Sequence, residues 1–252
     1  SSVMVLLIAF NTLNNCTQLK SKDVLGLSLT AALLFALNPL HTETVTYLSG
    51  RASGIGGFFF LLALLFFILG SERGRSLNIP LFYSLALLAF ILALLSKETT
   101  LIFPLVVILY DLCFMRGEGW RPFKNRLFFI YLPMSILVAA FVILSPPMRT
   151  LVMNWFWKAD PNYAFAQASI LVYALKLCLF PINLTFDYDL STNLGPLIFS
   201  HFIPLAIWLG TILVVVKNFR RISPVLVFSF LWFLITISPT NSFLPRADLL
   251  SE

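Results

Sequence analysis

Charged residues are scarce in this chain. Only 11% of its 252 residues are Asp, Glu, Lys or Arg, whereas 59% are hydrophobic and the mean hydropathy is +0.92. Soluble domains carry about 25% charged residues, so this composition excludes an ordinary soluble globular protein. Runs free of charge cover 52–71, 76–96, 127–148, 190–216 and 222–245, and each reaches the roughly 20 residues that a bilayer-spanning helix needs. We therefore expect an integral membrane protein.

Metal-ligand clusters and dense basic patches are also missing from the sequence. Cys16, Cys113 and Cys178 lie far apart and show no CxxC or Cys/His spacing, so we predict neither a metal site nor a disulfide framework. The net charge of +6 could suggest nucleic acid, but the 17 basic residues are scattered between apolar runs. That distribution is typical of membrane topology signals, and we expect no nucleic-acid partner.

The apolar segments predict an all-α fold, a polytopic membrane helix bundle that forms one transmembrane domain over 1–252. We expect about seven full spans and one truncated span, at about 1–10 (truncated), 24–40, 54–70, 79–95, 99–115, 126–145, 197–216 and 222–238. The first apolar run, Val3 to Phe10, has about half the length of a spanning helix. The chain also starts without Met, and we interpret it as an excerpt of a longer protein.

The apolar segment 166–181 decides the topology of everything after it. If it does not cross, one side of the membrane collects 11 of the 17 basic residues in short loops, as the positive-inside rule favours. The segment carries Gln167 and Lys176 and ends at Pro181, and a Lys within the bilayer costs several kcal/mol unless it snorkels. We predict a re-entrant or surface-lying helix within a large external loop, about 146–196.

This topology gathers unusual polar residues on the external face. They are His41 and Glu43, Arg51, Lys97 and Glu98 in a Ser-Lys-Glu turn, and Asp187 and Asp189. Cations and carboxylates at the hydrocarbon edge suit an anionic lipid headgroup and an acid/base task. Purely structural roles remain open for these residues. Lys97-Glu98 also fits a polar turn between two helices, and His41 to Glu43 also fits a loop that ends a helix.

Two further features favour structural roles. Asp111, at the inner end of the 99–115 segment, is expected to pair with a neighbouring basic residue or to snorkel. Gly50, Gly54, Gly56 and Gly57 lack the strand-to-helix context of a phosphate loop, and close helix packing explains them more simply.

Read together, the motifs resemble the transmembrane and tetratricopeptide-repeat O-mannosyltransferase family and its bacterial relatives. Their order and spacing both fit, and the resemblance covers nearly the whole chain. The matching blocks are Asn38-Pro39-Leu40-His41-Thr42-Glu43-Thr44-Val45, Ser49-Gly50-Arg51-Ala52, Leu95-Ser96-Lys97-Glu98, Leu109-Tyr110-Asp111-Leu112, Tyr173-Ala174-Leu175-Lys176, Phe180-Pro181-Ile182-Asn183-Leu184-Thr185-Phe186-Asp187-Tyr188 and Pro239-Thr240-Asn241-Ser242-Phe243.

The resemblance implies a GT-C-class membrane glycosyltransferase. Such an enzyme moves a hexose, with mannose favoured, from a polyprenyl- or dolichyl-phosphate carrier to an external or lumenal acceptor, with protein Ser/Thr favoured. The implied location is the bacterial inner membrane or the endoplasmic reticulum membrane, and the implied partners are membrane lipid, the lipid-phosphate-linked sugar and an acceptor protein. No cofactor beyond that donor substrate is implied. The class's acidic catalytic motif and the tetratricopeptide repeats are expected outside this excerpt, which by itself is expected to be inactive.

The remaining residues receive hypothetical roles within that resemblance. Arg51 and Lys97 are candidates for the carrier phosphate, because two cations would offset the charge that grows on the leaving group. His41 and Glu43 would orient the acceptor or support the missing catalytic Asp. Glu98 would hold Lys97 in position. Asp187 and Asp189 are candidates for the acceptor side.

Two other classes of function stay open. A transporter or flippase of lipid-linked substrates would also display charges at membrane depth, but its mark would be ionisable residues in mid-span or paired inverted repeats. The charges here lie near span ends, and no repeat is evident. A non-catalytic membrane scaffold is the third possibility.

Overall fold

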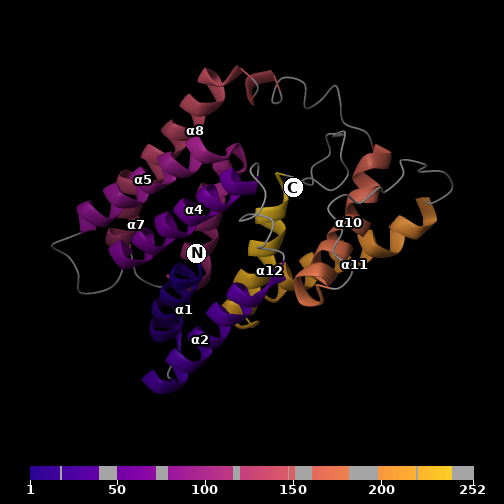
Figure 1. Ribbon diagram of the computed structural model, residues 1–252, viewed down its shortest axis with the longest axis horizontal. Coiled ribbons are helices and arrows are strands. Elements are labelled where there is room, and N and C mark those ends of the chain that lie inside the picture. The colour runs from indigo at the N-terminus through magenta and orange to yellow at the C-terminus, as the bar shows by residue number, and fades with distance from the viewer. Residues whose placement is uncertain are drawn as a thin grey trace. The chain divides into compact units, whose positions relative to one another are not determined.

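The computed structural model describes residues 1–17, 19–39, 50–71, 79–115, 120–146, 148–150, 161–181, 198–219 and 221–239. All regular secondary structure in these ranges is helical (Figure 1). The chain divides into two compact units, Ser1–Phe141 and Val142–Glu252, and each is considered by itself. The predicted all-α class is confirmed for the part of the chain that the structure describes.

Most helices of the first unit begin and end close to the predicted spans. They are α1 (Ser2–Cys16), α2 (Ser21–Leu37), α4 (Gly50–Ser71), α5 (Ile79–Ser96), the 3-10 helix η3 (Glu98–Ile102), α6 (Phe103–Phe114), α7 (Trp120–Arg126), the π-helix η4 (Leu127–Tyr131) and α8 (Leu132–Leu144). The second unit contains α10 (Pro161–Leu179), α11 (Ile198–Lys217) and α12 (Pro224–Ile237).

Three helical segments are long and apolar enough to cross a membrane. They are Gly50–Ser71, Ile79–Ser96 and Pro122–Leu144, the last of which runs continuously from α7 through η4 into α8. Shorter apolar helices cover Ser2–Cys16, Gln167–Leu179, Pro204–Lys217 and Pro224–Ile237. The architecture is that of a helical membrane bundle. The number of spans, the topology and the placement of 166–181 stay predictions.

Prolines explain two departures from regular α-helix. The predicted span 99–115 starts as the 3-10 helix η3, and α6 begins only at Phe103 with Pro104 in its first turn. Proline is tolerated there because the first N–H groups of a helix have no intrahelical partner. Pro133 is the second residue of α8, which follows the π-helix η4. Its ring would clash with the carbonyl four residues earlier, and the wider π turn relieves that clash.

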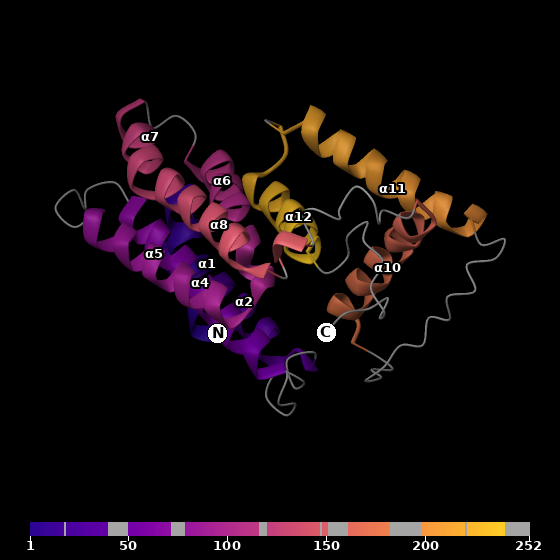
Figure 2. The ribbon, with the colours of Figure 1, turned by 90° about the horizontal axis from the view of Figure 1, so that it is seen from above.

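Aromatic side chains fill the core of the first unit between α4, α5 and the segment from η3 to α6. The helices α4 and α5 run side by side (Figure 2). Phe103 packs edge-on against Phe60 and stacks on Phe90, with ring centroids 5.1 Å apart in both pairs. Phe67 packs edge-on against Tyr110 at 6.2 Å. Such pairs stabilise by about 0.5–1.5 kcal/mol each beyond the area they bury, and here they fix the helix register.

Trp208 holds the second unit together. Its indole Nε1 donates a hydrogen bond to the carbonyl oxygen of Ala168 at 3.2 Å, which ties α11 to α10. Its ring also stacks on Phe230 and Phe233 of α12, with centroids 5.9 and 6.1 Å apart. This side chain of α11 therefore contacts both α10 and α12.

Candidate functional site

The turn after α5 holds Lys97 in a fixed backbone position. The Lys97 N–H donates to the carbonyl of Ala93 at 3.0 Å and so closes α5. The Lys97 carbonyl accepts two hydrogen bonds from Thr100, from the backbone N–H at 3.2 Å and from Oγ1 at 2.7 Å. Lys97 itself is extended, with φ −152° and ψ 129°. The backbone bonds on both sides direct its side chain toward α4.

The Lys97 side chain ends on a serine of α4. Its ammonium Nζ donates a 2.5 Å hydrogen bond to Ser53 Oγ, and the pair is partly buried. An ammonium has three donors and no acceptor, so the serine oxygen must be the acceptor. The hydroxyl hydrogen of Ser53 therefore points away from Lys97.

Gly56 brings the Lys97 turn close to α4. A Cβ atom at Gly56 would lie 3.2 Å from Lys97 Cβ, 3.5 Å from Thr100 Cγ2 and 3.7 Å from Ser96 Cβ. Ser53 and Gly56 are three residues apart and thus share one face of α4. A side chain at position 56 would require the turn to move away from α4 by a few tenths of an ångström. The expectation of close packing holds for Gly56, whereas Gly57 faces open space within 4 Å.

The structure places the two candidate phosphate ligands at the same end of the first unit. Arg51 lies in the first turn of α4, where it is exposed, two residues before Ser53. Residues two apart do not share a helix face, so Arg51 approaches the site from a different side of α4 than Ser53 does. Glu98 is exposed at the start of η3, next to Lys97. His41, Glu43, Asp187 and Asp189 lie outside the described residues.

The sequence reasoning missed Ser53 and the specific role of Gly56. A signal was present, because small residues occur at positions 53 and 56 of α4, which share one face of the helix. Their partner is 44 residues away in sequence, so only the fold reveals the contact. Among the described ranges, no group of three or more His, Cys, Asp or Glu side chains is arranged to hold a metal ion.

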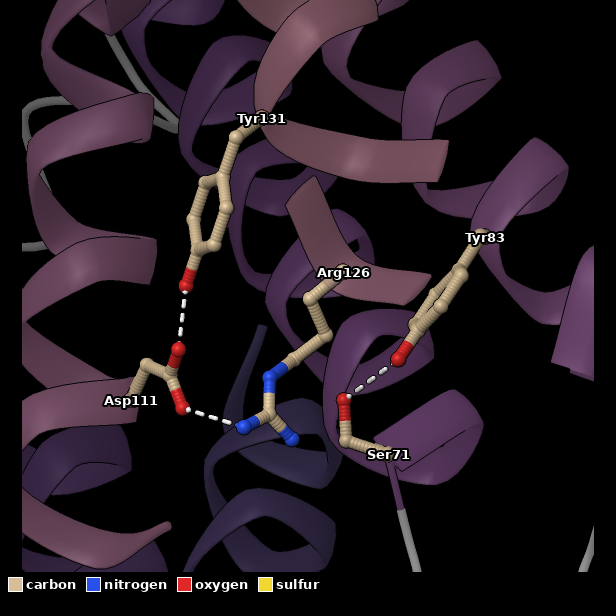
Figure 3. Close-up of polar contacts among 5 residues, drawn as sticks. All are labelled: Ser71, Tyr83, Asp111, Arg126 and Tyr131. Carbon is tan, nitrogen blue, oxygen red and sulfur yellow. Dashed lines mark hydrogen bonds and ion pairs between the residues drawn. The ribbon is translucent and has the colours of Figure 1, made fainter. Parts of the chain in front are cut away.

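A second polar cluster, the Asp111 cluster, consists of Asp111, Arg126 and Tyr131 (Figure 3). Arg126 Nη2 lies 3.1 Å from Asp111 Oδ1, and the Tyr131 hydroxyl donates to Asp111 Oδ2 at 2.6 Å. The side chains of Arg126 and Asp111 are only 4% and 11% exposed. The expectation that Asp111 pairs with a basic residue is confirmed.

The Asp111 cluster lies near the opposite end of the same helices. Tyr83, in the first turns of α5, shares a 3.1 Å hydrogen bond with Ser71 at the end of α4, and Figure 3 shows this pair beside Arg126. Lys97, just after the end of α5, lies 14 positions beyond Tyr83, which corresponds to about 20 Å along the helix axis. The two polar sites are therefore distinct.

Comparisons with known proteins give partial matches. A protein O-mannosyl-transferase of Caenorhabditis elegans is 28% identical over 177 residues, which cover 67% of this chain and 23% of that protein. Human protein O-mannosyl-transferase TMTC1 is 38% identical over 93 residues, which cover 34% of this chain and 10% of that protein. The mouse TMTC1 protein is 37% identical over 93 residues, with the same coverage.

These matches extend over a small part of each relative, so the chain spans about a quarter or less of the curated proteins it resembles. No protein-family model matches the chain, and no solved structure matches it. The names of the relatives agree with the family that the motifs indicated. That resemblance is confirmed: parts of the chain are similar in sequence to proteins named as protein O-mannosyl-transferases.

Proposed function

We propose that this chain forms part of the membrane core of a glycosyltransferase that uses a lipid-phosphate-linked sugar. The donor is a hexose, with mannose favoured, on a polyprenyl- or dolichyl-phosphate carrier. The acceptor is a hydroxyl on the external or lumenal side of the membrane, with protein Ser/Thr favoured. This assignment follows the GT-C-class resemblance and the names of the relatives.

The observation that carries the proposal is the placement of Lys97. Its ammonium is held in a defined position at the end of an apolar helix hairpin, by a backbone turn and by Ser53. A cation at that depth suits a phosphate that is anchored by its lipid tail in the bilayer. Arg51 at the same end adds a second cation, and its five N–H donors can bind phosphate oxygens in pairs.

The chemistry assigned to these cations is stabilisation of the leaving group. During transfer, the bond between sugar C1 and the carrier phosphate oxygen breaks, and its electron pair stays on that oxygen. The acceptor oxygen bonds to C1 and gives up its proton to a carboxylate base. Preorganised cations near the phosphate oxygen bind this growing charge more strongly than they bind the substrate, which lowers the barrier.

The other candidate residues keep supporting roles in this proposal. His41 and Glu43 would orient the acceptor or support the catalytic carboxylate, and Glu98 would act through Lys97. Asp187 and Asp189 would lie on the acceptor side. The proposed setting is the endoplasmic reticulum membrane or a bacterial inner membrane, with membrane lipid around the helices and the acceptor protein as partner.

Transfer by the full-length protein tests the proposal. We would measure sugar transfer from a panel of dolichyl- and polyprenyl-phosphate sugars to a Ser/Thr-rich peptide, with wild type and Lys97→Met. Removing one preorganised charge-stabilising group typically costs about 100-fold to 1,000-fold in kcat, and we expect a loss of that order. Lys124→Met is the matched control, because Lys124 is an exposed lysine of α7.

Each result bears on a different part of the proposal. Wild-type rate and donor affinity in Lys97→Met would overturn the phosphate assignment. A wild-type protein that transfers no sugar from any donor in the panel would overturn the transferase proposal and favour a transporter or a scaffold.

A further inference from the structure

Thr100, a buried residue of η3, holds the turn that carries Lys97. Its backbone N–H and its side-chain Oγ1 both donate to the Lys97 carbonyl, at 3.2 and 2.7 Å. We infer that Thr100 is a positioning residue, whose hydroxyl fixes the backbone of Lys97 and thereby the point from which the lysine side chain extends toward the carrier phosphate. This inference rests on the proposed function, because it assigns a new residue to the same site.

The Lys97 side chain cannot hold this turn by itself. Lys97 stands at the N-cap position of η3, and its side chain makes no capping hydrogen bond. The residues that favour this position, Ser, Thr, Asp and Asn, carry an oxygen that accepts from the first free N–H groups of the helix, whereas an ammonium can only donate. Here the side-chain bond runs the other way, from the Thr100 hydroxyl back to the N-cap carbonyl. The hydroxyl thus supplies a contact that a lysine at this position lacks.

The backbone of Thr100 connects the Lys97 turn to the aromatic core. The Thr100 carbonyl accepts the backbone N–H of Phe103. The Phe103 side chain is 1% exposed, and its ring packs against Phe60 and Phe90. Thr100 therefore ties the Lys97 backbone to the packed interior of the first unit. Because this tie acts on the backbone, it is the same whichever groups contact the Lys97 ammonium.

Both branches of the Thr100 side chain have a defined place. Oγ1 donates to Lys97, and the methyl Cγ2 faces α4, 3.5 Å from where a Cβ at Gly56 would stand. The side chain is buried, and threonine, like other β-branched residues, has few rotamers available. Valine would keep the shape and lose the hydroxyl, whereas serine would keep the hydroxyl and lose the methyl group. These two substitutions separate the hydrogen bond from the packing.

Kinetics of the full-length protein test the inference, with dolichyl-phosphate mannose as the donor and a Ser/Thr-rich peptide as the acceptor. Thr100→Val is expected to lower kcat about three-fold to ten-fold, since a misplacement of about 1 Å costs about 100-fold and this turn would shift by less. The KM for the donor should change little, because the lost alignment acts in the transition state. Thr100→Ser is expected to keep most of the wild-type kcat.

A double-mutant cycle and a matched control complete the experiment. In a Lys97→Met background, Thr100→Val should change kcat little, because the group that it positions is absent. Thr99→Val is the control, since Thr99 is the neighbouring threonine of η3 and its hydroxyl makes no hydrogen bond within the described part of the chain. Thermal midpoints in detergent verify folding. If Thr100→Val does not fold, Thr100→Cys takes its place with the same expected loss, because a thiol is only a weak donor.

The outcomes keep this inference apart from the proposed function. Wild-type kcat in the folded Thr100 variant, together with a strong loss in Lys97→Met, would overturn the role of Thr100 and leave the phosphate assignment intact. An equal loss in Thr100→Ser and Thr100→Val, or losses that simply add in the double variant, would also overturn it, because they indicate a threonine that only supports packing. Wild-type kinetics in Lys97→Met would remove the proposed phosphate site itself.

Discussion

The two ends of the first unit use charged residues in opposite ways. At the Asp111 cluster the arginine has a carboxylate partner, and both side chains are nearly buried. At the other end, Lys97 donates to a neutral hydroxyl, and the neighbouring Arg51 is exposed. A cation paired with a buried carboxylate supports the fold, because removing either partner would leave an uncompensated buried charge. The contrast agrees with our proposal that the Asp111 end supports the fold and the Lys97 end takes part in the chemistry.

The largest effect that we expect on stability comes from breaking the Asp111 cluster. Arg126→Ala leaves the mostly buried Asp111 carboxylate without its cation, and removing one partner of such a pair typically costs about 3–5 kcal/mol. The thermal midpoint of the purified protein in detergent should fall strongly. Lys124→Ala, two residues away and exposed, is the matched control and should change it little.

A second variant sharpens the same point. Replacing both partners, as in Asp111→Leu with Arg126→Leu, removes the charges together and should restore much of the stability, because no unpaired charge stays buried. If the double variant were as unstable as Arg126→Ala, the cost would come from lost packing, and the cluster would not be an electrostatic support.

The next effect concerns the second close contact between α4 and α5. A Cβ at Gly70 would lie 2.8 Å from Tyr83 Cε1, 2.9 Å from Tyr83 Cδ1 and 3.0 Å from Phe82 Cβ. The Tyr83 ring is 3% exposed and hydrogen-bonded to Ser71, so it has little room to move. Gly70→Ala should destabilise by about 1–3 kcal/mol, as overpacked cores do.

Gly57→Ala provides the comparison, because Gly57 faces open space on the same helix. Its helix propensity should even improve slightly with alanine. Equal thermal midpoints for Gly70→Ala and Gly57→Ala would contradict the close packing at the α4 end.

The positions of several helices could be predicted because membrane-spanning segments are recognisable in a sequence as long apolar runs. The expected range 79–95 agrees with α5, and the expected range 197–216 agrees with α11, each within a residue. The 3-10 start at Glu98 was not predicted, since Pro104 fits either a helix start or a loop. The π turn before Pro133 was also missed, because it depends on how the helix relieves a backbone clash.

The candidate site was predictable only in part. Lys97 and Arg51 stand out as rare charges beside apolar runs, and a single sequence is enough to flag them. Ser53 does not stand out, because serine is common in membrane helices and its hydrogen-bond partner lies far away in sequence, in the turn after α5. Likewise, Asp111 could be expected to pair with a basic side chain. That this side chain is Arg126 depends on the packing of η4, which follows Arg126, against α5.

At the Lys97 end, Gly56→Ala should affect activity more than stability. The added Cβ would push the Lys97 turn away from α4 by a few tenths of an ångström, since it would lie 3.2 Å from Lys97 Cβ. Misplacement of a charge-stabilising group lowers the rate, and we expect a several-fold loss of kcat/KM for the donor with less than about 1 kcal/mol of destabilisation. Gly57→Ala is again the control. If Gly56→Ala lost stability but transferred sugar at the wild-type rate, Gly56 would have only a structural role.

The smallest effect tests whether the structural end stays separate from the chemistry. Tyr83→Phe removes the hydroxyl that bonds Ser71 at 3.1 Å, in a partly buried position, and keeps the ring that packs on Phe67. A neutral hydrogen bond of this kind contributes about 0.5–1.5 kcal/mol, so the thermal midpoint should fall slightly. Transfer should match wild type, because Tyr83 lies about 20 Å along α5 from Lys97. A changed KM for the lipid-linked donor in this variant would show that the two ends are coupled through α5, and the division between structure and chemistry would then fail.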